Sequence, residues 1–138
     1  MVDRRLLTEK VDSVQRSLKR INAFRGESVE RFSEDAVSQD VVLFHLMQAI
    51  QACIDLASPV NSDEALGLAG STHDFFYLLA DNGVITRQLC ERMILAVGFR
   101  NLVAHEYTKL DLEKVFYIAH HAIGDIEEYL RSIAQRYA

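Results

Sequence analysis

The stretch of sequence that decides the fold is LMQAIQACIDLA, residues 46–57. It lies in a longer segment whose apolar side chains, from Val41 to Leu56, spread around much of a helix rather than along one face. A helix that is apolar on several sides is buried on several sides, so this segment predicts the central helix of a bundle. We expect the helix to run from about Ser33 to Ala57, with Pro59 closing it and residues 60–70 forming an irregular connection.

The rest of the chain supplies helices to surround the central one. Six glycines and a single proline leave little turn material for an all-β protein, and 138 residues suit one domain with a real core. Apolar periodicity and capping residues predict further helices over 3–24, over 72–82, from a cap at Thr86 through the 99–107 segment, and from a cap at Asp111 nearly to the C-terminus. The predicted fold is therefore all-α: a single domain over 1–138, an up-and-down bundle of four main helices plus one short helix.

Composition limits where the protein works and what it binds. With 49% hydrophobic and 25% charged residues it is an ordinary soluble composition, and a net charge of -5 argues against holding nucleic acid by bulk electrostatics. Cys53 and Cys90 fall in apolar helical stretches and are expected to be small buried side chains in a reducing compartment. The sequence offers no apolar run of signal-peptide length and no uninterrupted membrane-spanning stretch, so we expect no membrane association and a cytoplasmic location.

The first predicted helix is basic on the side opposite its apolar face. Concentrated positive charge in an acidic protein could guide a polyanion. The simpler interpretation is a solvated face with Glu9 and Asp12 interspersed. The basic residues are Arg4, Arg5, Lys10, Arg16, Lys19 and Arg20.

The segment FRNLVAHEY, residues 99–107, places unusual chemistry on a helix that otherwise resembles core. Asn101 and His105 are one turn apart on one face, and the long side chain of Arg100 can reach forward beside the imidazole. An arginine fork suits a phosphate, and a histidine can transfer a proton near neutral pH. The three residues are therefore candidates for cleaving a phosphodiester, although an ordinary solvated helix face is the alternative.

The sequence lacks the motifs of several other kinds of catalytic site. The chain has no Glu-x-x-His pair of the di-iron bundles, and Lys109 stands where a His-Glu-x-x-His zinc motif starting at His105 would need its second histidine. A glycine-rich phosphate loop and a Gly-x-Ser-x-Gly elbow are also missing from the sequence. We therefore expect a mechanism without metal or cofactor.

One pattern in residues 99–107 resembles the signature of HEPN-domain ribonucleases. It consists of arginine, any four residues, histidine, any one residue and tyrosine, with a polar residue directly after the arginine. The closer resemblance is to the HepT toxins of toxin–antitoxin pairs. It also covers residues 46–57, which look like the family's long second helix, and the Gly83-Val84-Ile85 turn before the motif helix. Roughly the whole chain can be laid on the family, which a short motif match by chance would not allow.

The resemblance implies a HEPN-like helical domain and an endoribonuclease toxin that acts on RNA as a homodimer, with two motifs lining a shared cleft. His105 would be the general base for a ribose 2′-hydroxyl or the acid for the leaving oxygen, and Arg100 would stabilise the transition-state charge. Asn101 would orient the imidazole or bind a phosphate oxygen.

The resemblance also implies a partner and a means of control. HepT toxins are paired with MntA-type minimal nucleotidyltransferase antitoxins, which transfer AMP onto the tyrosine of this motif, here Tyr107. The alternative function is a non-catalytic helical subunit that presents substrate to a small nucleotidyltransferase, because HEPN proteins without a complete motif resemble such partners.

Overall fold

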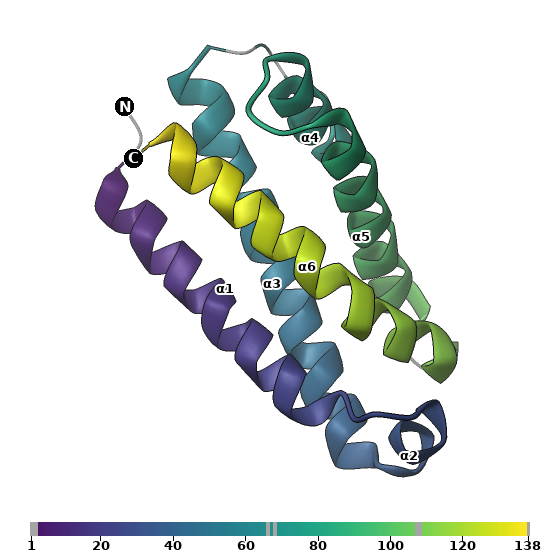
Figure 1. The fold of residues 1–138 in the computed structure, drawn as a ribbon. Helices are drawn as coiled ribbons and strands as arrows, with labels where there is room; N and C mark the ends of the chain where they lie inside the picture. The colour runs from purple at the N-terminus through teal and green to yellow at the C-terminus, as the bar shows by residue number, and fades with distance from the viewer. Residues whose placement is uncertain (1–2, 66, 68, 107–108, 138) are drawn as a thin grey trace.

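The computed structural model describes residues 3–65, 67, 69–106 and 109–137, and these residues form six α-helices and no strand. Four long helices pack lengthwise, and the described termini lie together at the end of the bundle opposite α2 (Figure 1). The predicted all-α bundle of four main helices is confirmed, with α4 as the predicted short helix and α2 as an additional one. The helices are α1 (Arg4–Phe24), α2 (Val29–Glu34), α3 (Ala36–Asp63), α4 (Thr72–Asp81), α5 (Arg87–Glu106) and α6 (Leu112–Arg136).

Side-chain caps fix where the helices begin. The Thr86 hydroxyl accepts a hydrogen bond from the Leu89 amide at 3.1 Å, and the Asp111 carboxylate accepts one from the Glu113 amide at 3.0 Å. Each cap satisfies an amide that has no partner within its own helix. The predicted starts of α5 and α6 are therefore confirmed, and with them the position of the 99–106 segment at the end of α5.

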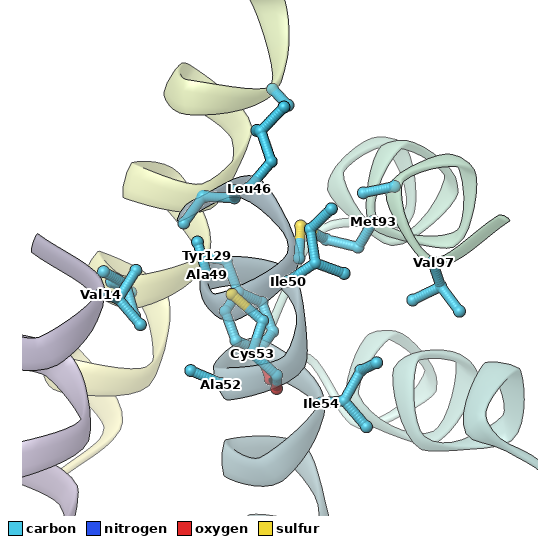
Figure 2. Packing of buried hydrophobic residues seen from close by; sticks show 14 of the residues in the cluster. Val14, Leu46, Ala49, Ile50, Ala52, Cys53, Ile54, Met93, Val97 and Tyr129 are labelled. Atoms are coloured by element: carbon cyan, nitrogen blue, oxygen red, sulfur yellow. Dashed lines mark hydrogen bonds between the residues drawn. The ribbon is translucent and has the colours of Figure 1, made fainter. Parts of the chain in front are cut away.

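The central position of α3 is also confirmed. Its Leu46, Ile50 and Cys53 side chains are fully buried, and Figure 2 shows α3 residues packed among side chains from α1, α5 and α6. The side chain of Tyr129 on α6 reaches across the core, and its hydroxyl donates a hydrogen bond to the Cys53 carbonyl at 2.9 Å. Burial raises the pKa of the Cys53 thiol, and that of the Cys90 thiol, so neither is a ready nucleophile.

By length and composition alone, residues 36–62 of α3 form a helix able to cross a membrane. Within its most apolar window, however, 56% of the helix is buried inside the protein. This burial is what the central helix of a bundle requires, and the apolar composition of α3 is accounted for by the core.

The predicted start of the central helix near Ser33 is wrong. Asp35 has an extended backbone (φ -111°, ψ 92°) that separates α2 from α3. Its carboxylate accepts hydrogen bonds from the Ser38 amide at 3.1 Å and the Ser38 hydroxyl at 2.7 Å. The residues before Asp35 form the separate short helix α2. Ser28 caps its N-terminus, and the ring of Phe32 is buried in the core.

The predicted end of the same helix is also wrong, because α3 continues past Pro59 to Asp63. Proline has no N–H to donate within the helix. This loss is tolerated because the extra turn buries Val60 completely and leaves Asn61 only 3% exposed. The Asn61 amide nitrogen donates to the Ala57 carbonyl at 3.0 Å and to the Phe75 carbonyl at 3.2 Å. Contacts with α4 therefore carry the helix into the connection predicted to be irregular.

We expect Tyr129→Phe to lower the free energy of unfolding by about 1 kcal/mol, since it removes one buried hydrogen bond and little volume. Tyr117→Phe is the matched control because its side chain lies on the surface at 60% exposure. Urea titrations of both variants test this, and equal stabilities would contradict a role for the Tyr129 hydroxyl.

Candidate active site

The candidate site lies on the last two turns of α5, at the end of the bundle near α2 and the start of α6 (Figure 1). Phe99 and Val103 point into the core, and their burial leaves Asn101 and His105 exposed on the other side of the helix. Both side chains are therefore accessible from the protein surface. Tyr107 lies outside the described residues.

Arg100 is half-buried and held on two sides. Its Nη1 donates to Oε1 of Gln51 on α3 at 2.6 Å. Its Nε and Nη2 both donate to Oδ1 of the adjacent Asn101, at 3.2 and 2.6 Å. The guanidinium group is therefore fixed between two neutral amide oxygens and keeps its full positive charge.

The hydrogen bonds leave Arg100 able to bind an anion. A guanidinium group has five N–H donors, and the contacts to Gln51 and Asn101 use three of them. One donor on each terminal nitrogen has no partner among the described residues. Two donors on adjacent nitrogens suit two oxygens of one phosphate.

Gln51 is the site residue that the sequence analysis missed. Besides accepting from Arg100, its Nε2 donates to Oδ1 of Asp55 at 3.0 Å, and Oδ2 of Asp55 pairs with Lys10 of α1 at 3.4 Å. This chain of contacts joins α5 to α3 and α1. A signal was available, because Gln48, Gln51 and Asp55 recur at three- and four-residue intervals in the otherwise apolar stretch 46–57.

His105 is exposed and makes no hydrogen bond with the other described residues. Its ring is therefore accessible to a large substrate. Asn101 uses its amide oxygen to hold Arg100, a contact that the sequence analysis did not anticipate. His45 of α3 faces α1, with Nδ1 3.2 Å from the Ser17 hydroxyl.

A hollow of about 350 Å³ lies between α3 and the end of α5, where Val103 and Ala104 line it directly before His105. Its opposite wall includes Phe44 and Asp40 of α3. Apart from the Asp40 carboxylate, the described residues that line it are apolar, and apolar walls that include an aromatic ring suit a flat nucleobase. Among the described residues, no three His, Cys, Asp or Glu side chains are grouped to hold a metal ion, and metal independence stays a prediction.

A family model described as Ribonuclease HepT-like matches residues 14–133. The chain belongs to the HepT-like ribonuclease family. The predicted family resemblance is thereby confirmed, and the motif helix lies within the matched residues.

HepT-like relatives match over nearly their whole length. The mRNA nuclease HepT of Shewanella oneidensis is 34% identical over 125 residues, which are 91% of this chain and 93% of the relative. The tRNA nuclease HepT of Aphanizomenon flos-aquae is 24% identical over 93% of this chain and 87% of the relative. A solved structure of the tri-AMPylated Shewanella oneidensis HEPN toxin with MNT antitoxin has a TM-score of 0.88 and 33% identity, covering 98% of this chain and 99% of that one. The HEPN-like helical fold is therefore confirmed.

We expect Gln51→Leu to reduce RNA cleavage, the activity of HepT-like ribonucleases, by about tenfold, because a hydrogen bond that positions a charged group is lost while side-chain size is kept. Gln88→Leu is the matched control: Gln88 is an exposed residue of α5 with no hydrogen bond among the described residues. Cleavage rates of the two folded variants decide the matter, and equal rates would exclude a positioning role for Gln51.

Proposed function

We propose that this chain is the toxin of a toxin–antitoxin pair and cleaves RNA without a metal ion, using Arg100, Asn101 and His105 in the cleft of a homodimer. The observation that carries the proposal is the fixed guanidinium group of Arg100, with two unused donors, on the same helix end as an exposed histidine. Membership of a ribonuclease family supports RNA as the substrate.

The chemistry follows from the side chains. His105 removes the proton of a ribose 2′-hydroxyl, the 2′-oxygen attacks the adjacent phosphorus, and the bond to the 5′-oxygen breaks. Arg100 binds the phosphate oxygens, on which negative charge accumulates in the transition state. The products are a 2′,3′-cyclic phosphate and a 5′-hydroxyl group, whose oxygen takes up a proton as it leaves.

One histidine cannot serve as base and acid in the same step, so a second copy of His105 from a symmetric subunit would supply the leaving-group proton. The surface of α5 supports such an assembly. Leu95 and Leu102 are 72% and 36% exposed and lie seven residues apart, about two turns, on the motif helix. A second copy packed there would bring two motifs close together.

Control by a nucleotidyltransferase is the second part of the proposal. The similar Shewanella oneidensis toxin was solved with AMP groups attached and in complex with MNT antitoxin. We propose that an MntA-type antitoxin likewise transfers AMP to Tyr107 of this chain, in the cytoplasm. A phosphodiester charge and a bulky nucleoside two residues after His105 would occupy the space that RNA needs.

We expect the purified protein to cleave RNA, and not DNA, in excess EDTA and to leave 2′,3′-cyclic phosphate ends, because the attacking group is the 2′-hydroxyl. His105→Ala should stay folded and dimeric but lose cleavage, and Arg100→Lys should be poor because a point charge replaces a bidentate fork. End-group analysis and sedimentation measure these outcomes. Loss of cleavage in EDTA with recovery in magnesium would exclude the mechanism, and an inactive wild type would favour the substrate-presenting subunit.

Tyr107→Phe should retain much of the nuclease activity and lose modification by the antitoxin, because the accepting hydroxyl is missing. Intact-mass spectra after co-expression with the cognate nucleotidyltransferase measure the AMP-sized increments. Increments that persist unchanged in Tyr107→Phe would show that AMP is attached elsewhere.

A further inference from the structure

The structure divides the basic side of α1 into two parts. In the first half of the helix, Arg5 pairs with Glu9 at 3.4 Å, and Lys10 pairs with Asp55 of α3 at 3.4 Å. Neighbouring carboxylates thus balance these cations, as expected for a solvated helix face.

The second half of α1 differs. Arg16, Lys19 and Arg20 line a hollow of about 560 Å³ between α1 and α3, here called the cationic hollow. None of the three pairs with a carboxylate among the described residues, and no Asp or Glu side chain lines the hollow. In a chain of net charge -5 this concentration of unpaired cations produces a local positive potential.

Phe44 of α3 gives the cationic hollow an aromatic wall. Its ring is 57% exposed although it belongs to a large apolar side chain. The ring packs edge-on against His45 with centroids 5.1 Å apart, and Nδ1 of His45 lies 3.2 Å from the Ser17 hydroxyl. These contacts hold Phe44 in place with much of its surface open. Exposed aromatic rings beside cations are the usual platform for single-stranded nucleic acid.

The cationic hollow adjoins the candidate active site. Phe44 also lines the mainly apolar hollow that Val103 and Ala104 form just before His105, in which Asp40 is the one charged residue among the described lining residues. Gln48 borders the cationic hollow, and three residues further along α3, about 4.5 Å along the helix axis, Gln51 holds Arg100. A single strand bound at Arg100 can therefore continue across Phe44 into the cationic hollow.

We propose that the cationic hollow binds the sugar–phosphate backbone of the RNA substrate beside the cleaved bond, with Phe44 stacking on a neighbouring base. This inference rests on the proposed ribonuclease function and adds a substrate-binding site to it. The site recognises phosphate charge and a base face, so it would position RNA with little dependence on sequence.

The test compares Arg16→Gln/Arg20→Gln with the charge-matched control Arg4→Gln/Arg5→Gln, whose residues lie at the other end of α1. Binding of a fluorescent single-stranded RNA of about twelve nucleotides is measured in a His105→Ala background over a range of salt. We expect Arg16→Gln/Arg20→Gln to bind RNA about tenfold more weakly. The slope of log K against log salt, which is negative, should become less steep by about 1.4, because two phosphate contacts are lost. The control should change neither quantity. Phe44→Ala should weaken binding without changing the slope, since stacking releases no counterions.

Cleavage kinetics separate this inference from the proposed function. With His105 present, Arg16→Gln/Arg20→Gln should raise KM for the long RNA but cleave a dinucleotide as the wild type does, because a dinucleotide does not reach the hollow. Cleavage and binding of the long RNA that match the control would overturn the inference and leave the ribonuclease proposal standing. The inference would also be overturned if Arg16→Gln/Arg20→Gln bound RNA normally but no longer bound the antitoxin. It would be overturned too if sedimentation showed that Phe44→Ala weakens RNA binding by dissociating the dimer. A wild type that neither binds nor cuts RNA would overturn the ribonuclease proposal itself.

Discussion

The structure depends on the burial of α3 against the other helices. Each fully buried leucine or isoleucine, such as Leu46 and Ile50, contributes about 1.5–3 kcal/mol relative to an exposed one. This burial leaves a narrow surface strip on α3 that carries Phe44, Gln48 and Gln51. The strip lies between α1 on one side and the end of α5 on the other, so the central, buried helix of the bundle also supports the candidate site.

The choice of glutamine at position 51 has an electrostatic consequence. A half-buried guanidinium group needs hydrogen-bond acceptors, and a carboxylate would satisfy it while cancelling its charge. The amide oxygens of Gln51 and Asn101 fix the group of Arg100 at 2.6 Å without neutralising it. The side chain is thus ordered before substrate arrives and still carries the charge that a phosphate would pair with, which lowers the entropic cost of binding.

The parts of the fold that the sequence predicted correctly depend on interactions between residues close together in the chain. Apolar periodicity and the Thr86 and Asp111 caps located α5 and α6, because a cap needs only the first turn of its helix. The continuation of α3 past Pro59 depends on Asn61 reaching a carbonyl on α4, which periodicity does not contain. The same distinction holds for the candidate site. Motif spacing predicted Arg100, Asn101 and His105, whereas the spacing of that motif does not include Gln51, which contacts Arg100 across 49 residues of sequence.

The distribution of charge explains how an acidic protein can act on RNA. A net charge of -5 opposes binding to nucleic acid at a distance, so attraction must come from the few cations whose charge is not balanced nearby. Arg100 is held by neutral amides, and Arg16, Lys19 and Arg20 line a hollow without carboxylates, whereas Lys10 is paired with Asp55. These four cations lie on either side of the α3 strip. Under the proposed function, they give RNA a path across the protein surface from Arg100 over Phe44 to the cationic hollow.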